Sequence, residues 1–146
     1  MHVEERERIA RHAAESLGDA HSIFIGGGAT ALHFARALRL IDRRLTVLTA
    51  SLSVAMEVST NTLIEVMVLP GIVEPKEGQV HGAETLQSIS RFRTPLAIVG
   101  ASALDETGVS DALLSAAQVY SAMIANADHT FVLADSSKFG QRSLQL

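Results

Sequence analysis

Short apolar runs alternate along this sequence with longer segments whose apolar residues recur at helical spacing. Buried strands are predicted where the runs are continuous and rich in Ile, Leu and Val: residues 22–26, 45–50, 64–69, 96–100 and 130–134. Helices are predicted where apolar residues recur at i, i+3, i+4 and i+7: residues 3–17, 29–40, 52–58, 83–92 and 112–126. This alternation predicts an α/β fold with a mostly parallel sheet flanked by helices on both faces, in a Rossmann-like arrangement.

Gly, Ser and Pro mark where several of these elements begin and end. Gly18 is placed to cap the C-terminus of the first helix, and Ser51 to cap the N-terminus of the helix after the second strand. Pro70 and Gly71 stop the third strand, and residues 72–82, with one Pro and two Gly, indicate a loop or a hairpin. Pro95 is expected just beyond the fourth helix, and residues 101–111 are expected to form an irregular loop.

The helical pattern also predicts which side chains face the core. In the last helix the inward positions are Leu113, Ala116, Ala117, Tyr120, Met123 and Ile124. By the same periodicity Met56 and Met67 are expected in the core.

The end of the sequence predicts an excised domain. Residues 135–140 read as a loop, and the six residues after Gly140 are expected to be too few for a further element. We therefore expect residues 1–146 to form a single domain whose C-terminus is truncated.

Composition narrows the functional classes. The chain has 146 residues, 47% of them hydrophobic, no Cys and a net charge of −4. Without Cys there is no disulfide frame or thiolate site, and none of the six His residues forms an i, i+4 pair, so we expect no metal and no cofactor. The acidic balance gives no basic surface for nucleic acid, and no apolar run is long enough to span a membrane. A cytoplasmic location is the default expectation.

The stretch from Ser22 to Thr30 carries the most chemistry. Its apolar run leads into Gly26, Gly27 and Gly28 and then directly into a helix. Glycines let a ligand approach the backbone, and the first N–H groups of a helix lack intrahelical partners, so the stretch predicts a site for phosphate or carboxylate. Its spacing matches neither the dinucleotide fingerprint nor the Walker A loop, and a simple tight turn remains the alternative.

Ligands of open α/β sheets bind outside the carboxyl ends of the strands. That rule brings together residues 26–30, 49–51, 70–71, 100–105 and 135–138, which are rich in Gly, Ser and Thr and include one Lys. Such residues suit phosphate and hydroxyl groups, and no nucleophile stands at a motif spacing from a base. Lys138 is either a solvated charge or a ligand contact, and Asp105 is either a turn residue or an acceptor for a sugar hydroxyl. His81, beside a glycine in the long loop, is the His most worth following.

Read in order, these segments resemble the C-terminal effector-binding domain of DeoR-type bacterial transcriptional regulators. The most specific match is residues 134–140, Ala-Asp-Ser-Ser-Lys-Phe-Gly, and the likeness covers essentially the whole chain. The resemblance implies a fold related to ribose-5-phosphate isomerase and a sensor that binds a phosphorylated sugar. It implies contact with DNA only through an N-terminal winged helix-turn-helix that is missing here.

Departures from the family pattern concern the sugar half of the site. The resemblance places an Asp at Gly26 and another at Ser102, so two carboxylates are lost, while the backbone and Lys positions are kept. Carried over, it implies a phosphate site at Gly27, Gly28, Ala29, Thr30, Ser51, Gly71 and Lys138. It implies sugar contacts at Ser102, Asp105, His81 and Asp135. An altered or smaller effector, or a weakened site, is therefore expected.

Three functions stay open at this point. The first is the ligand sensor of a repressor of a carbohydrate-catabolic operon, which would be a homo-oligomer, dimer or tetramer, because paired operator half-sites need paired subunits. The second is a sugar-phosphate isomerase-like enzyme, which would need a positioned base in place of the lost carboxylates. The third is an oligomerisation module with a decayed site.

Overall fold

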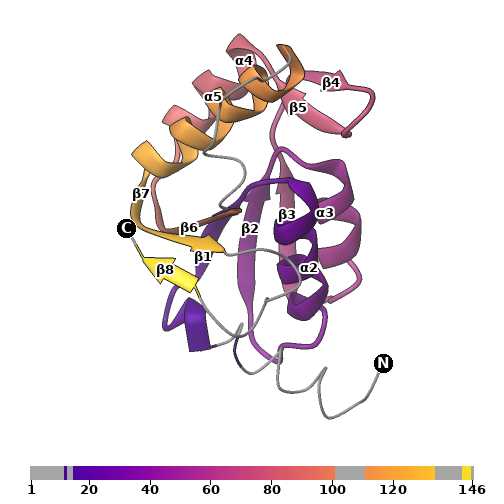
Figure 1. The fold of residues 1–146 in the computed structure, drawn as a ribbon. Helices are drawn as coiled ribbons and strands as arrows, with labels where there is room; N and C mark the ends of the chain where they lie inside the picture. Colours follow the sequence, from indigo (N-terminus) through magenta and orange to yellow (C-terminus); the bar gives the residue numbers. More distant parts are fainter. Residues whose placement is uncertain (1–11, 13–14, 101–110, 134–142, 146) are drawn as a thin grey trace.

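Five parallel strands form the centre of the fold (Figure 1). This computed structural model describes residues 12, 15–100, 111–133 and 143–145. The strands are β1 (Ser22–Ile25), β2 (Leu45–Thr49), β3 (Ile64–Val68), β6 (Thr94–Gly100) and β7 (Ala127–Leu133). A sixth strand, β8 (Ser143–Gln145), runs antiparallel to β7, and the sheet order is β3-β2-β1-β6-β7-β8. The predicted fold class is confirmed.

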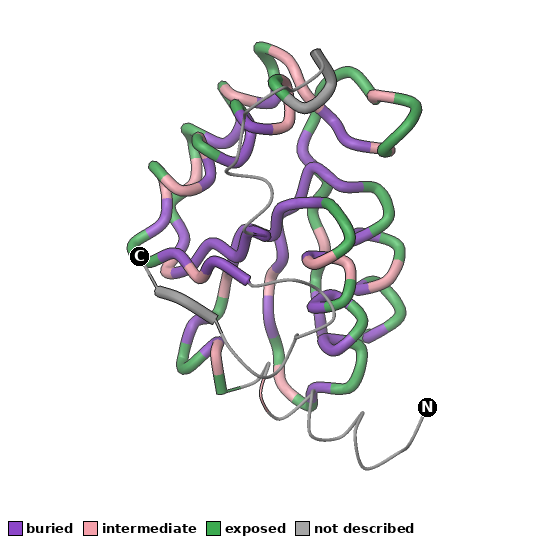
Figure 2. Tube along the Cα trace, viewed as in Figure 1, coloured by how far each residue is buried: buried purple, intermediate pink, exposed green. Residues whose placement is uncertain are grey.

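Helices cover both faces of this sheet (Figure 1). On one side lie α2 (Gly28–Leu38) and α3 (Leu52–Val58), and on the other lie α4 (Ala83–Ser90) and α5 (Asp111–Ala125). The alternation of β1 shows why two cores result. Ile23 and Ile25 pack with the buried residues of α2 and α3, whereas Phe24 packs with those of α4 and α5. The central strands are accordingly buried along their length (Figure 2).

Residues 72–82 form a hairpin, one of the two predicted alternatives. β4 (Ile72–Glu74) pairs antiparallel with β5 (Gln79–His81). Backbone hydrogen bonds attach the hairpin to the connection between β2 and α3: Val80 N–H donates to the Ala50 carbonyl at 2.7 Å, and Leu52 N–H to the Gly78 carbonyl at 3.0 Å. The hairpin is thereby held at the carboxyl end of β2.

Most element boundaries agree with the sequence, and three need correction. β7 begins at Ala127, three residues before the predicted start of that strand. Thr94 already belongs to β6, so Pro95 lies inside the strand near its start rather than between helix and strand. Pro95 is not among the residues of β6 whose Cα partners in β1 and β7 are assigned, which suits a residue without an N–H donor. The end of the chain is not too short for a further element, because β8 forms after Gly140 and needs only three residues to pair with β7.

The sequence predicts buried side chains correctly on the face of α5 that packs against the sheet, but not at two methionines on the outside of the fold. Ala117, Tyr120 and Met123 of α5 are buried, while Ala116 and Ile124 are half-buried. Met56 was wrongly expected in the core: it lies on the outer side of α3 and is 72% exposed. Met67 is also exposed, because β3 is an edge strand of the sheet. The side chain of Leu113 and residues 3–11 lie outside the described residues.

The first helix is described only in part. Residues 15–17 are helical, Leu17 is buried, and Gly18 follows with a φ of +56°, as expected of a glycine that ends a helix. No described helix has the length and hydropathy needed to cross a membrane.

Candidate ligand site at the head of α2

The predicted site residues follow the carboxyl ends of the parallel strands, as the topology requires. Glycines 26–28 follow β1, Ser51 follows β2, and Gly71 follows β3. Because these three strands are neighbours and parallel, their connections emerge at the same edge of the sheet. Ser102, Asp105, Asp135 and Lys138 fall in the connections after β6 and β7, outside the described residues, so their roles stay predictions.

The glycine stretch leads directly into the N-terminus of α2. Gly27 is the N-cap and supplies no side-chain hydrogen bond to the helix. Gly28, the first helical residue, has a φ of +89°, a conformation that favours glycine, and open space surrounds its Cα. Gly28 and Ala29 are exposed and Thr30 is half-buried, so the N-terminal turn of the helix faces solvent. Its uncapped N–H groups and the helix dipole favour an anion at this point.

Tyr120 of α5 packs against the glycine loop. Its hydroxyl oxygen accepts a hydrogen bond from Gly27 N–H at 3.1 Å, and its ring would lie 3.0 Å from a Cβ at Gly26. The glycine at position 26 therefore leaves the space that this ring fills. Burial raises the pKa of the Tyr120 hydroxyl and the charge of Glu77 adds to the rise, while the hydrogen bond from Gly27 lowers it. The hydroxyl is thus a neutral group at neutral pH.

Gln79 of β5 packs against the same loop. A Cβ at Gly27 would overlap Gln79 Oε1 and come within 3.1 Å of the Tyr120 hydroxyl. Gln79 is only 5% exposed, and its Nε2 is buried without a hydrogen-bond partner in the described part of the chain. A buried donor without a partner is unusual in native proteins, where such groups are nearly all satisfied.

Ser51 performs the local role that its sequence context predicts. Its Oγ accepts from Val54 N–H at 3.2 Å and so caps α3. Thr49, fully buried, joins this connection to the first: its Oγ1 donates to the Ile25 carbonyl at 2.8 Å and accepts from Ser51 N–H at 3.1 Å. The ends of β1 and β2 are therefore fixed relative to each other, and Ser51 is 4% exposed.

The structure explains why position 71 is a glycine. Its φ is +145°, and a Cβ there would overlap Thr85 Oγ1 and lie 2.6 Å from the His81 carbonyl oxygen. Gly71 thus allows the chain to turn into the hairpin beneath α4. His81 ends β5, pairs with Ile72 across the hairpin, and is half-buried.

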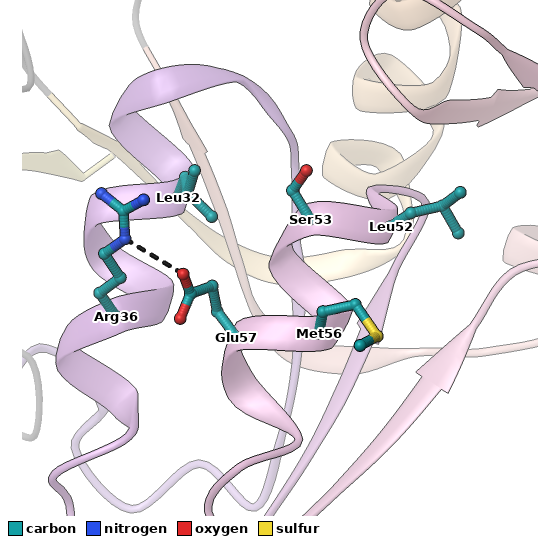
Figure 3. Close-up of a pocket in the computed structure, with 6 residues that line it drawn as sticks. All are labelled: Leu32, Arg36, Leu52, Ser53, Met56 and Glu57. Carbon is teal, nitrogen blue, oxygen red and sulfur yellow. Dashed lines mark hydrogen bonds and ion pairs between the residues drawn. The ribbon is translucent and has the colours of Figure 1, made fainter.

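A groove between α2 and α3 is a separate feature (Figure 3). It is lined by Leu32, Arg36, Leu52, Ser53, Met56 and Glu57. Arg36 Nε lies 3.2 Å from Glu57 Oε1, so the positive charge in the groove is already paired, which disfavours an anion there. Within the described residues no group of three or more His, Cys, Asp or Glu side chains is arranged to hold a metal ion.

Sequence reasoning missed two of the side chains that pack against the glycine loop. Tyr120 was expected only to face the core, and Gln79 was not singled out. The glycines themselves were the available signal: two successive positions without side chains at a strand end leave a volume that other side chains must fill. The sequence does not reveal which distant residues do so.

A parallel sheet covered on both faces, with a glycine loop and an uncapped helix at its carboxyl edge, is the arrangement of Rossmann-like ligand-binding domains. The particular family follows from comparison with known proteins. The family model of the DeoR C terminal sensor domain matches residues 1–145, and the chain belongs to this family.

Several curated relatives of this chain are transcriptional repressors. The glycerol-3-phosphate regulon repressor of Escherichia coli (strain K12) is 32% identical over 143 residues, which are 97% of this chain and 56% of that protein. The HTH-type transcriptional repressor CsqR of the same organism is 31% identical, over 94% of this chain and 52% of that protein. The HTH-type transcriptional repressor GlcR of Bacillus subtilis (strain 168) is 29% identical, over 96% and 54%. The chain thus spans about half the length of the curated relatives it matches.

Proposed function

We propose that this chain is the ligand-sensing part of a transcriptional repressor of carbohydrate catabolism, and that it binds a phosphorylated sugar or a related phosphorylated metabolite. The observation that carries the proposal is the uncapped, solvent-facing N-terminus of α2 behind Gly27 and Gly28. Phosphate is one of the anions that such a terminus binds. The relatives support this reading, since one of them is named for the glycerol-3-phosphate regulon.

The proposed phosphate contacts are Gly27, Gly28, Ala29, Thr30, Ser51, Gly71 and Lys138, and the proposed contacts to the rest of the ligand are His81, Ser102, Asp105 and Asp135. The backbone of the first loop would supply N–H donors, and Lys138 the positive charge. Contact with DNA would be made by a part of the protein other than the residues described. Binding of the effector would change the affinity of that part for its operator.

A regulator is favoured over an enzyme by a specific feature of the loop. An isomerase on this fold would need a positioned acid or base beside the ligand. Gly26 carries no side chain, and the space beside it is filled by the ring of Tyr120, a weak acid whose pKa is raised further. Turnover of a pentose or hexose phosphate by the purified chain would favour the enzyme instead.

Self-association forms part of the proposal, because repressors of this family would bind paired operator half-sites. Its support is the exposure of four apolar side chains on the edge strand and the hairpin, Met67, Val68, Ile72 and Val73. Exposed apolar edges of this kind favour contact with another chain. A Val68→Lys variant should lower the mass measured by light scattering to that of the monomer.

A thermal-shift screen tests the proposed function. The chain is heated with sugar phosphates, glycerol 3-phosphate, free sugars and inorganic phosphate. A ligand at 100 times its dissociation constant stabilises the native state by about 2.7 kcal/mol, which moves the midpoint by several degrees. A shift with one phosphorylated compound supports the sensor function. A shift with inorganic phosphate alone supports a site that binds phosphate but no longer binds the sugar. No shift with any compound would favour the oligomerisation module with a decayed site.

Lys138→Ala and Gly28→Val locate the ligand. Lys138→Ala should weaken phosphate binding by about 1.5 to 3 kcal/mol, the range for a hydrogen bond to a charged group. Gly28→Val should abolish binding, because the branched side chain would stand where the phosphate approaches the backbone and the φ of +89° disfavours it. If both variants bind phosphorylated ligands as well as the parent, the ligand lies elsewhere.

A further inference from the structure

Gln79 presents a buried amide whose donor has no partner, and this amide lies at the glycine loop. The residue is 5% exposed, and Nε2 has no hydrogen-bond partner in the described part of the chain. The carboxamide carbon would lie 3.3 Å from a Cβ at Gly27, so the amide packs directly on the residue that precedes α2. If this side chain only filled space, an apolar side chain of the same length would do so equally well and would leave no buried donor unpaired.

Backbone contacts fix the position of this side chain. Gln79 forms an antiparallel bridge with Ser51, and its neighbours in the hairpin hydrogen-bond to Ala50 and Leu52. The hairpin is therefore registered against the β2–α3 connection, next to the end of β1. This registry explains how a residue far from Gly27 in the sequence reaches the head of α2.

The amide can serve an anion at this position as a donor. In the structure Oε1 is the end that faces Gly27. A half-turn about χ3, a torsion with broad two-fold preferences, exchanges the two ends and brings Nε2 to the loop. An acceptor oxygen on a ligand would then give Nε2 the partner that the described residues do not supply.

Several groups around the loop can donate hydrogen bonds. The N-terminal N–H groups of α2 are uncapped, and the Tyr120 oxygen accepts from Gly27, which leaves the hydroxyl hydrogen to donate. Glu77, whose charge acts on Tyr120, is exposed. Such donors favour ligand groups that only accept hydrogen bonds, such as carboxylates, over hydroxyl groups, which also carry a donor that needs a partner.

We propose that Gln79 is a specificity-determining residue of the ligand site, and that its carboxamide selects a phosphorylated carboxylic acid over a phosphorylated polyol. The inference rests on the proposed function, because it assumes that a phosphorylated ligand binds at the head of α2. It goes beyond the proposed function because it specifies the chemical group that the ligand carries next to its phosphate, a carboxylate.

Gln79→Met tests the inference, since Met keeps the length of the side chain and removes its donor. Calorimetric titration of the chain compares 3-phosphoglycerate, glycerol 3-phosphate and inorganic phosphate. The parent should bind 3-phosphoglycerate about tenfold or more tightly than glycerol 3-phosphate, the factor expected of one hydrogen bond to a charged group. In Gln79→Met that preference should disappear, while the affinity for inorganic phosphate stays within about twofold of the parent. Gln87→Met, the same change at an exposed position of α4, should leave all three affinities unchanged.

Thermal unfolding separates a ligand-binding role from a structural one. Without ligand, Gln79→Met should melt at the temperature of the parent or above it, because the variant no longer buries an unpaired donor. A fall of several degrees would show that the amide stabilises the fold and would overturn the inference. Should Gln79→Met fail to fold, Gln79→Glu replaces the donor with a carboxylate of the same shape and should repel 3-phosphoglycerate more than inorganic phosphate.

The remaining outcomes distinguish the two proposals. If the parent binds phosphorylated compounds but Gln79→Met keeps the parent's preference, the inference is wrong and the sensor function stands. A parent that prefers glycerol 3-phosphate also overturns the inference alone. If the parent binds none of the three compounds or the wider set of sugar phosphates, both proposals fail.

Discussion

The connections after β1 and after β2 lie side by side at one edge of the sheet, yet their helices begin in different ways. Helix α3 is capped by the residue just before it, since Ser51 Oγ accepts from Val54 N–H. Helix α2 has no side-chain cap, and its loop is supported by Tyr120 and Gln79 from distant parts of the sequence. In a capped helix N-terminus, a side chain already provides a hydrogen-bond partner for one of the free backbone N–H groups. An uncapped one at the same edge remains available for a ligand.

The same difference governs how the two connections tolerate change. In the second connection, loss of the Ser51 side-chain cap acts on α3 alone. In the first, a side chain added at Gly26 or Gly27 meets buried side chains that belong to other elements. Small changes in the sequence at Gly26 or Gly27 should therefore have large effects on stability and, under the proposed function, on binding.

The largest effect is expected for Gly27→Ala. Its Cβ would overlap Gln79 Oε1 and approach the Tyr120 hydroxyl, so two buried side chains must move. Overpacking of this kind costs about 1 to 3 kcal/mol of the free energy of unfolding, and displacement of the loop should abolish phosphate binding. Urea unfolding and calorimetric titration measure the two effects. Gly18→Ala is the control: it has open space around it, and it should lower stability through its positive φ without changing binding.

Tyr120→Phe should have the next largest effect. The variant keeps the ring that fills the space at Gly26 and removes the acceptor for Gly27 N–H. Because Gly27 is buried, its N–H would lose its partner, and we expect a loss of about 1 to 3 kcal/mol in the free energy of unfolding. Urea unfolding measures it. A stability equal to that of the parent would mean that water or a shifted loop satisfies this N–H, and that Tyr120 acts on the loop through its ring alone.

Ser51 offers a smaller and more local test of the comparison. Ser51→Ala should cost about 1 kcal/mol through loss of the cap, whereas Ser51→Gly, a tolerated N-cap, should cost only a few tenths. The Gly variant therefore removes the hydroxyl while nearly keeping the stability of α3. If Ser51 also contacts the phosphate, as the site proposal states, Ser51→Gly should bind phosphate more weakly in a calorimetric titration. Unchanged affinity would restrict Ser51 to its capping role.

These two connections also show how far the sequence leads. The strands, the helices and the Ser51 cap were predicted because each depends on residues close together in the chain. The glycine loop that we propose as an anion site was predicted from three adjacent glycines for the same reason. Gln79 and Tyr120 reach that loop only through the docking of the hairpin and the packing of α5, which are long-range events. The periodicity that correctly buried Met123 misplaced Met56 and Met67, because a helical or strand pattern does not say whether an outer position is covered by another element.

The smallest expected effect concerns the ionisation of Tyr120. It tests whether the Tyr120 hydroxyl is buried where it contacts the first connection. The chain contains one Tyr and no Trp, so phenolate absorbance in the near ultraviolet reports this residue alone. Burial raises its pKa above the ordinary value of 10.0 in the folded chain. The folded state therefore holds the proton more tightly than the unfolded state, and stability is complete below about pH 10 and declines as the pH rises from there through the folded pKa. Tyr120→Phe should remove this part of the pH dependence. A Tyr120 that titrates at or below its ordinary pKa in the folded chain would show that the loop leaves the hydroxyl open to water, and the contrast between a supported first connection and a locally capped second one would then lose its physical basis.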